Sequence, residues 1–389
     1  MCSIKAILRV ARRECLIMLK HPIYLVCMIF FPLLVTAFFT TLMNEGQPEE
    51  MPIGIVDQDN TSTTRKLTRM LDSFQSSKVV AHYGTVDEAR HAVQRGEIYA
   101  FLFFPKHTTD DLLASRQPKV SFYYSNTSIT AGSLLFKDMK TICTLGSAAV
   151  GQATMQAKGF TPEQITAMLQ PIAVDAHTIG NPWINYNIYL SSMLVPGCLM
   201  LFIFLMTPYS FGTEIKFGTT KELIETANNS TFCAIVGKLL PQTLIFLTVI
   251  SIAMTYMFGI MQFPAPGGKG ALLLLAFLSV IASQGFSLLI FGLMPSLRLA
   301  MSICSLWAVL SFSMVGSAFP VFAMDSPLQL LAWLFPLRHY YMIYQLCIFN
   351  SFPLSYAWTH IAMLLLFSML PWLLVKRIGK ALRTFSYMQ

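Results

Sequence analysis

Few stretches of the 389-residue sequence place reactive side chains at a spacing that chemistry requires. Pro266–Gly270 reads Pro-Gly-Gly-Lys-Gly, but a phosphate-binding loop needs four residues between its first Gly and a Gly-Lys-Ser or Gly-Lys-Thr end. Asp57–Asn60 holds two carboxylates, which hard cations favour, yet it lies between an expected strand and an expected helix. That position favours a turn with an N-cap. We therefore predict no catalytic, cofactor-binding or metal site in this chain.

A different kind of chemistry, recognition by a charged helix, is indicated for residues 210–238. Thr219–Glu222 has the pattern of a capping box, in which Thr and Glu satisfy free amides at a helix start. Leu223, Ile224 and Ala227 would then form an apolar stripe beside charged faces. Such a helix fits a groove on a partner protein or lies at a lipid surface. Two Glu and one Lys on its polar face favour the protein partner.

Composition places this charged segment in a membrane protein. The mean hydropathy is +0.57 and only 12% of residues are charged, against about 25% in soluble domains. Crossing a hydrocarbon core of about 30 Å takes about 20 helical residues, and six apolar runs are long enough. These runs are 23–43, 184–209, 239–261, 271–294, 299–322 and 356–375.

The distribution of Lys and Arg predicts the orientation, because positive residues stay on the cytoplasmic side. With an inside N-terminus, the inner segments hold Lys5, Arg9, Arg12, Arg13, Lys20, Lys216, Lys221, Lys238, Arg298, Lys376, Arg377, Lys380 and Arg383. The short outer loops hold Lys269 and Arg338. We therefore expect both termini in the cytoplasm and residues 44–183 outside. This bias explains much of the net charge of +8, so no nucleic-acid partner is needed.

Residues 44–183 alternate β-rich and helical patterns and predict an inserted α/β domain with a mixed sheet. The expected strands are 53–56, 78–83, 98–104 and 120–124, and the expected helices are 61–74, 85–95, 107–115 and 128–158. Thr85–Glu88 is a second capping-box pattern. The predicted fold class is thus a six-span α-helical membrane protein with an external domain of mixed sheet and one long helix.

The spans argue against chemistry of their own. Within the predicted boundaries, spans two to five hold no ionisable side chain in the apolar interior, which disfavours an ion-coupled carrier. An intramembrane enzyme would need a spaced nucleophile and base or metal ligands. A membrane receptor with an external ligand-binding domain is the alternative to a transporter that another protein drives.

Several short motifs resemble a known family. The charged region supplies Glu214, Gly218, Thr219, Glu222, Leu223, Gly237, Lys238 and Pro241. Other parts supply Arg13–Glu14, Lys20–Pro22, Gly54–Asn60, Arg95–Glu97, Phe319–Pro320, Ser326–Pro327, Leu334–Pro336 and Leu337–Tyr341. The chain resembles a permease subunit of the ABC-2 type of ABC transporter, from the bacterial exporter subgroup with a large external domain after span one. Asn228–Asn229 departs from the family's usual Thr-Pro.

The resemblance implies an arrangement of domains and partners. A cytoplasmic amphipathic helix (1–22) precedes span one, 323–355 forms re-entrant outer helices, and 376–389 is a cytoplasmic tail. Two identical or related permeases would pair in the bacterial inner membrane. A separate ABC ATPase subunit would bind ATP and Mg, and a periplasmic adaptor protein is a further partner. The cargo would be drugs or other amphiphiles.

The resemblance also implies roles for individual residues. ATPase coupling falls to Glu214, Gly218, Thr219, Glu222, Leu223, Gly237 and Lys238, although Lys238 would equally suit a snorkelling position. We expect spans two and five to line the path, through Asn185, Asn187, Ser191, Ser192, Ser305 and Ser313; for the serines of span five, helix packing is an equal alternative. The outer gate would be Phe319, Pro320, Pro336 and Arg338.

Overall fold

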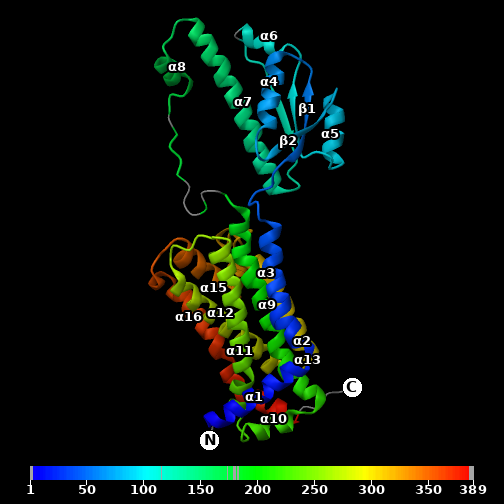
Figure 1. Ribbon diagram of the computed structural model, residues 1–389, viewed down its shortest axis with the longest axis vertical. Helices are drawn as coiled ribbons and strands as arrows, with labels where there is room; N and C mark the ends of the chain where they lie inside the picture. Colours follow the sequence, from blue (N-terminus) through cyan, green and yellow to red (C-terminus); the bar gives the residue numbers. More distant parts are fainter. Residues whose placement is uncertain (1–2, 115, 173, 178–180, 182–183, 385–389) are drawn as a thin grey trace. The chain divides into compact units, whose positions relative to one another are not determined.

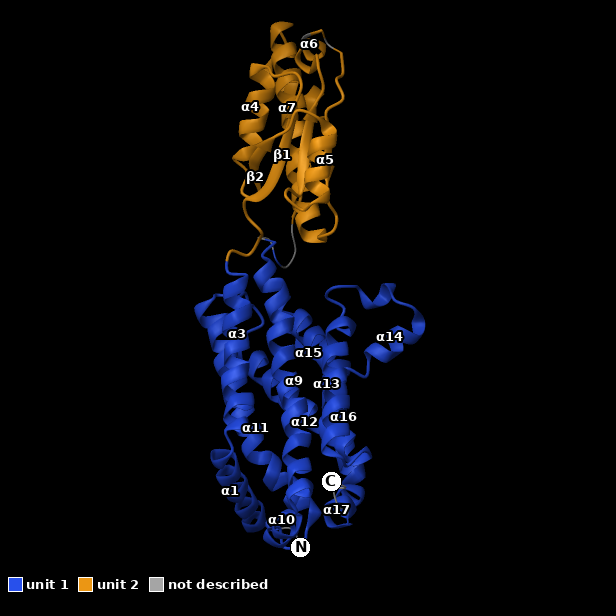
Figure 2. Ribbon diagram, turned by 90° about the vertical axis from the view of Figure 1, so that its right-hand side faces the viewer, with its two compact units in different colours: residues 1–44, 180–389 blue, residues 45–179 orange. Residues whose placement is uncertain are grey.

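The computed structural model describes residues 3–114, 116–172, 174–177, 181 and 184–384. Figure 1 traces the chain, and Figure 2 shows its two compact units. Residues 1–44 and 180–389 form one unit, here called the membrane unit, and residues 45–179 form the other, here called the inserted unit. Each unit has its own hydrophobic core, so each is described by itself.

The inserted unit contains a four-stranded sheet in the order β2-β1-β3-β4. Its strands are β1 (Met51–Asp57), β2 (Ser77–His82), β3 (Ala100–Phe104) and β4 (Ser121–Tyr124). β1 pairs in parallel with β2 and β3, and β3 pairs antiparallel with β4. The expected mixed sheet is therefore confirmed, with each strand within two residues of its predicted start.

Helices cover both faces of this sheet, and the strands divide their side chains between them. Along β1, Ile53 and Ile55 join the core under α4 (Ser62–Asp72) and α7 (Ile129–Ala157), whereas Val56 joins the core under α5 (Val86–Gln94). This division follows from the period of two along a strand. Figure 1 shows α4 and α5 on opposite sides of β1 and β2.

Local signals account for the helix ends in the inserted unit. Thr85 and Glu88 form the expected capping box at the start of α5. The long helix α7 ends before Gly159, whose φ of 84° is the left-handed conformation that Gly adopts at little cost. α6 (Thr108–Leu113) and α8 (Pro162–Leu169) complete the unit.

Six helical stretches of the membrane unit are long and apolar enough to cross a bilayer, within the described residues. Three of them are single helices, namely α9 (Tyr186–Phe217), α12 (Lys269–Leu293) and α13 (Leu297–Met314). The stretch Pro22–Leu42 consists of α2 (Pro22–Leu25), η1 (Val26–Phe30) and α3 (Phe31–Leu42), and the stretch Thr231–Ile260 consists of α11 (Thr231–Thr255) and η2 (Tyr256–Ile260). The last stretch, Leu354–Thr384, consists of η5 (Leu354–Ala357), α16 (Trp358–Met369), η6 (Leu370–Leu374) and α17 (Val375–Thr384).

α12 lies at the centre of this unit and contacts α9, α11, α13, α15 and α16. Gly285 lets α12 approach α16 closely, because a Cβ at this position would lie 2.3 Å from the carbonyl oxygen of Phe367. α9 packs along α3, α12 and α13. These two helices therefore connect most of the membrane unit.

Several helices begin or end away from the predicted span boundaries. The helix of the third span begins at Thr231 rather than 239, and the last helical stretch continues to Thr384 rather than 375. The second span does not end at 209, because α9 continues to Phe217 and ends at Gly218, which has a φ of 70°. The fifth span ends at Met314 rather than 322. Glu214 and Lys238 therefore belong to the same continuous helices as the second and third predicted spans, at the ends of these helices beyond the predicted boundaries.

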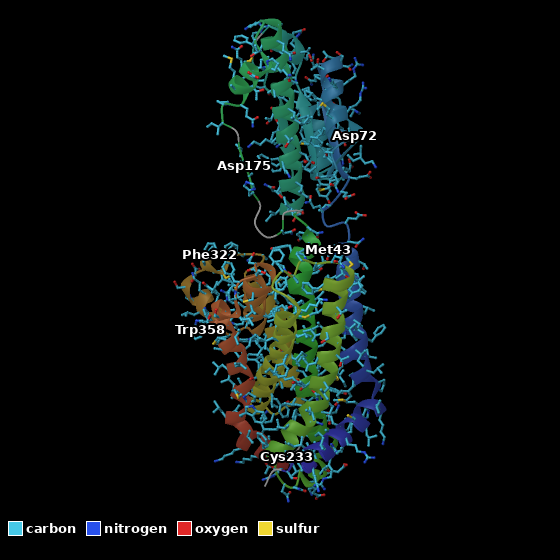
Figure 3. All side chains as sticks on the ribbon, turned by 60° about the vertical axis from the view of Figure 1, so that its left-hand side comes forward. Met43, Asp72, Asp175, Cys233, Phe322 and Trp358 are labelled. Carbon is cyan, nitrogen blue, oxygen red and sulfur yellow. The ribbon has the colours of Figure 1, made fainter. Side chains whose placement is uncertain are left out.

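The opposite ends of the membrane unit carry different short helices. One end holds α1 (Ile4–Lys20), α10 (Thr220–Thr226) and α17, as Figures 1 and 2 show. The other end holds α14 (Ser326–Ala332) and α15 (Pro336–Ile343), which continues as η4 (Tyr344–Phe349). In Figure 3, Cys233 lies at the first end, and Phe322 and Trp358 lie toward the second.

Candidate functional site

The first helix packs one face tightly against α11. Its spacing of four residues places Ala6, Val10 and Met18 on this face, where all three are buried. Gly237 of α11 allows the close approach, because a Cβ there would lie 2.6 Å from the Cβ of Val10. α1 ends at His21, directly before Pro22, which cannot continue a helix.

Glu14 occupies the same face of α1 and is completely buried. Its Oε2 lies 2.5 Å from Nζ of Lys238, and the same Nζ lies 2.9 Å from Oε1 of Glu214. Lys238 is 1% exposed and Glu214 is 3% exposed. A single lysine of α11 thus bridges two carboxylates that come from α1 and from the last turns of α9. The predicted snorkelling position of Lys238 is wrong, because its ammonium group does not reach the surface.

Arg13, the neighbour of Glu14, extends the network to α10. Its guanidinium group binds both carboxylate oxygens of Glu214, at 2.7 Å and 3.1 Å, and its Nε lies 3.0 Å from Oε1 of Glu222. Thr219 donates a further hydrogen bond to Oε2 of Glu214. Arg13, Glu14, Glu214, Glu222 and Lys238 are called the ionic cluster below.

Burial and charge have opposing effects on the first-helix members of the cluster. Burial alone lowers the pKa of Arg13, but the hydrogen bonds that Arg13 donates to Glu214 and Glu222 outweigh this effect and raise the pKa above its ordinary value. Arg13 therefore stays charged. Burial raises the pKa of Glu14, and the adjacent ammonium group of Lys238 opposes this effect. Glu14 depends on Lys238 for its charge to be tolerated at all.

The cluster joins four elements that are distant in the sequence. Arg13 and Glu14 come from α1, Glu214 from α9, Glu222 from α10 and Lys238 from α11. Removing one partner from a buried ion pair typically costs about 3–5 kcal/mol, because the other charge stays buried and unpaired. Each of the buried charges therefore requires its partner from another helix as long as these elements stay packed together. The cluster therefore holds the ends of two spans and the two adjoining short helices together.

α10 lies where the sequence predicts a helix, but its apolar stripe faces inward. Leu223, Ile224 and Ala227 are buried in the hydrophobic core of the membrane unit. The predicted capping box is also wrong, because Thr219 makes no cap bond and Glu222 binds Arg13 instead. The exposed face of α10 consists of Lys221, Glu222 and Glu225, next to Phe217, which is 68% exposed.

The break after α10 contacts two other helices. Asn228 and Asn229 have φ values of 54° and 59°, a left-handed conformation that Asn adopts more readily than most residues. This conformation explains why two Asn residues serve in this turn. Arg9 of α1 donates to Oδ1 of Asn228 at 2.8 Å, and Arg383 of α17 donates to the carbonyl oxygen of Asn229 at 2.9 Å.

Comparison with known families accounts for this architecture. The profile described as ABC-2 family transporter protein matches residues 22–375. The chain belongs to this family. A comparison with curated proteins finds no match. The region that matches the ABC-2 family includes Glu214, Glu222 and Lys238. It begins after α1, so Arg13 and Glu14 lie outside it.

The structure places the expected path residues of this ABC-2 transporter in different environments. Asn187, Ser191 and Ser192 are buried within the chain. Asn187 donates to the carbonyl oxygen of Thr40 in α3 at 2.9 Å and accepts from Ser191 at 2.6 Å. These side chains are therefore packed and hydrogen-bonded within this chain. Asn185 caps α9 by accepting from the amide of Ile188.

On α13, the expected path serines do not gather with those of α9. Ser313 is exposed and Ser305 is half-buried, where it bonds to the carbonyl oxygen of Ser302 in its own helix. The coupling residues behave differently, because Glu214, Thr219, Glu222 and Lys238 meet in one cluster, with Gly237, Gly218 and Leu223 beside it. The roles in the path stay predictions.

The expected outer-gate residues surround the end of α13. Phe319 and Pro320 are exposed, Pro336 is buried in the first turn of α15, and Arg338 donates to the carbonyl oxygen of Val315 at 3.1 Å. Residues 333–335 separate α14 from α15, so the segment 323–355 contains these two as distinct short helices. Within the described residues, neither α14 nor α15 is long enough to cross a bilayer.

A histidine pair beside these outer helices was missed by the sequence analysis. Nδ1 of His339 lies 2.9 Å from Nδ1 of His360, and Nε2 of His339 lies 2.8 Å from the carbonyl oxygen of Trp333. A carbonyl oxygen only accepts, so Nε2 of His339 carries a proton. Burial lowers the pKa of His339 to about 4, with the Trp333 carbonyl opposing this shift. The spacing of the two histidines in sequence gives no signal for their pairing.

Proposed function

We propose that this chain is the membrane-spanning permease subunit of an ATP-driven ABC-2 exporter, and that a separate ATPase subunit moves it by pressing on α10. The ionic cluster is the observation that carries this proposal. Because Arg13 binds Glu222 of α10 and Glu214 of α9 together, a displacement of α10 would pull on the last turns of α9. Lys238 extends this connection to α11.

The length and the packing of α9 support transmission of a displacement along this helix. The helix contains 32 residues, and at 1.5 Å per residue it is about 48 Å long, which exceeds the hydrocarbon thickness. It packs along α3, α12 and α13 for much of this length. A push received at Glu214 would therefore displace three other spans as well. The buried apolar stripe of α10 supports this role, because it joins the helix to the membrane unit rather than to the partner.

The partner would contact the exposed face of α10 and the aromatic ring of Phe217. Lys221 and Glu225 have no role in the ionic cluster and are exposed, so they are available for contact. ATP and Mg would bind to the partner, because this sequence has no phosphate-binding loop. In this proposal, coupling passes from Lys221, Glu225 and Phe217 through the cluster to Glu214 and Lys238.

The finer features of the proposal are the direction, the cargo and the assembly. Both termini lie in the cytoplasm of a bacterial cell, as the Lys and Arg distribution favours, and the inserted unit lies outside. Two identical or related permeases enclose the path, and a periplasmic adaptor protein receives the cargo. Drugs and other amphiphiles fit a path built from apolar spans. Export rather than import follows from placing a folded unit on the receiving side.

The coupling proposal is tested by two matched charge reversals in the permease–ATPase complex. Lys221→Glu reverses a charge on the exposed face of α10. Lys269→Glu makes the same reversal at an exposed position at the start of α12, away from α10. We expect Lys221→Glu to reduce recovery of the ATPase with the permease about tenfold, the effect of losing about 1.4 kcal/mol of binding free energy. Lys269→Glu should leave recovery unchanged. Equal recovery for both variants would contradict coupling through α10.

The transport proposal requires a second measurement, in sealed vesicles with a fluorescent amphiphilic dye. Accumulation should require ATP and should stop when a non-hydrolysable analogue replaces it. Dye accumulation by the permease alone, without any nucleotide, would exclude the proposed division between conduit and motor. Binding of the dye to the inserted unit without any transport would favour the receptor alternative instead.

A further inference from the structure

Beside the ionic cluster, the structure contains a pocket of about 690 Å³ between α1, α10 and the end of α9. Its lining runs along α1 from Arg9 to Lys20, continues to Tyr24 of α2, and faces Tyr209, Thr213 and Phe217 of α9. The cluster residues Arg13, Glu214, Glu222 and Lys238 also line it. A volume of this size accommodates the headgroup and upper part of an acyl chain rather than a small ion alone.

The charges in this pocket are not balanced. Five positive charges come from Arg9, Arg12, Arg13, Lys20 and Lys238. Three negative charges come from Glu14, which binds Lys238 from outside the lining, and from the lining carboxylates of Glu214 and Glu222, which leaves a net +2 without His21. All three carboxylates are already bound by Arg13 or Lys238. The side chains of Arg12 and Lys20 have no hydrogen-bond or ion-pair partner among the residues that the structure describes. The charged groups of Arg12 and Lys20 are therefore available to bind an anion.

Apolar and aromatic surface lies next to these cations. Tyr24 and Tyr209 meet edge to face, with ring centroids 5.6 Å apart, and Leu16, Ile17 and Phe217 complete this part of the lining. A free phosphate would leave this surface exposed to water. A ligand with an anionic group and an attached apolar chain would cover both kinds of surface.

The order of side chains around α1 connects the pocket to the bilayer. At about 100° per residue, Ile4, Leu8 and Leu19 share one stripe of the helix. All three are exposed, by 76%, 57% and 81%. Arg12 and Leu16 border this stripe, and Lys20 and Arg13 follow on the side of the pocket. α1 also leads directly into the first span at Pro22, so an apolar chain can leave the pocket along the stripe.

We propose that this pocket binds the phosphate headgroup of an anionic membrane lipid, with Arg12 and Lys20 as the principal contacts. The lipid would bridge α1 to the end of α9 on the open side of the ionic cluster. A ligand that binds only the assembled state stabilises it, so the lipid would strengthen the association of α1 with α9 and α10. The proposal concerns a ligand of the chain itself and stands whether or not an ATPase binds α10.

The test uses the full-length chain without any ATPase, purified in detergent and titrated with lipid in native mass spectrometry. Phosphatidylglycerol and phosphatidylcholine with identical acyl chains are the two probes. We expect the wild type to bind phosphatidylglycerol at least tenfold more tightly than phosphatidylcholine. The variant Arg12→Gln with Lys20→Gln should lose about tenfold in phosphatidylglycerol affinity or more, since each basic residue near an anionic surface contributes about 1 kcal/mol, or about fivefold.

The matched control is Lys376→Gln with Lys380→Gln, which removes two charges from exposed residues of α17 outside the pocket. This control should bind phosphatidylglycerol as the wild type does, and thermal unfolding should show that both double variants are folded. Equal losses in the two double variants would mean general surface attraction and would overturn the proposal. Displacement of the lipid by inorganic phosphate would also overturn it, because the pocket would then take the free anion. Equal affinity of the wild type for the two lipids would exclude an anionic-lipid site.

Discussion

Lys238 is a charged side chain that the fold removes from water almost completely. The ammonium group is tolerated there because Glu14 and Glu214 lie within 2.5 Å and 2.9 Å. Such pairs add little stability relative to apolar residues, but each partner becomes necessary for the other. The ionic cluster therefore specifies which helix ends belong together, more than it increases the free energy of unfolding.

This interdependence predicts the behaviour of Lys238→Met. The variant leaves Glu14 buried without a cation, so we expect a loss of about 3–5 kcal/mol in the free energy of unfolding. Lys238→Met combined with Glu14→Gln should lose clearly less, because no buried carboxylate is then left without a cation. Lys221→Met, at an exposed position, should change the free energy by less than about 0.5 kcal/mol. Denaturant unfolding in detergent micelles measures all three; equal losses in the single and double variants would contradict the interpretation.

The histidine pair predicts a dependence of the outer helices on pH. Burial lowers the pKa of His339 from 6.5 to about 4, so the fold favours the neutral ring. A group with a lowered basic pKa contributes its full stability above the unfolded pKa and loses it as pH falls through that value. Between about pH 7 and pH 5, the loss is about 2 kcal/mol for an isolated group with these pKa values.

Hydrogen exchange of α15 and α16 measures this effect. We expect exchange of their amides, corrected for the intrinsic rate, to become faster at the lower pH. His339→Phe removes the titrating ring next to His360 and Arg338, so it should abolish most of the pH dependence even if it raises exchange at both pH values. An unchanged pH dependence in this variant would show that another group is responsible.

At the scale of elements, α1 depends on the absence of a side chain at Gly237. α1 packs so closely on α11 that a Cβ there would lie 2.6 Å from the Cβ of Val10 and 2.8 Å from the carbonyl oxygen of Ile7. The same contact brings Glu14 to Lys238. The position of α1 and the formation of the ionic cluster are thus set together.

Gly237→Ala should therefore displace α1, although Ala is the better helix former. Overpacking of this kind costs about 1–3 kcal/mol, and it should lower the midpoint of thermal unfolding. Gly270→Ala is the matched control, because a Cβ in the first turn of α12 meets nothing within 4 Å. That variant should be neutral or slightly stabilising. A neutral Gly237→Ala would mean that α1 is not tightly packed on α11.

At the scale of the whole molecule, the two units have separate cores. The core of the membrane unit contains no residue of the inserted unit, and the two cores of the inserted unit contain no residue of the membrane unit, within the described residues. Within the membrane unit, Asn187 of α9 donates to the carbonyl oxygen of Thr40 in α3, so the two helices that flank the insertion in the sequence are bound to each other directly. The membrane unit should therefore fold without the insertion.

Replacement of residues 45–179 by a short Gly/Ser linker tests this independence. Size-exclusion chromatography and thermal unfolding should show a monodisperse membrane unit with nearly the stability of the full chain. The same replacement combined with Lys238→Met should then lose as much free energy of unfolding as Lys238→Met is predicted to lose in the full chain. Aggregation of the linker variant, with the full chain well folded, would show that the insertion is needed for the spans to assemble.

Prediction from sequence succeeded where a local pattern was enough. The β-rich run 53–56 predicted a strand, which the structure contains as part of β1, and Thr85 with Glu88 predicted a capping box that the structure also contains. The same pattern at Thr219 and Glu222 predicted a capping box that the structure does not contain. Both side chains there bind residues that are distant in sequence or on the previous helix, and these contacts outcompete the local cap.

The sequence alone predicted six spans and an inserted α/β unit, because long apolar runs and strand patterns depend on neighbouring residues only. Its motifs added a resemblance to the ABC-2 family, which the match over residues 22–375 then showed. Only the tertiary structure revealed that Leu223 faces inward, that Lys238 is buried, and that Arg13 and Glu14 complete its site. The reason is physical. A charge on a helix is tolerated in the interior only if partners from other helices meet it there, and no spacing within one helix shows whether they do.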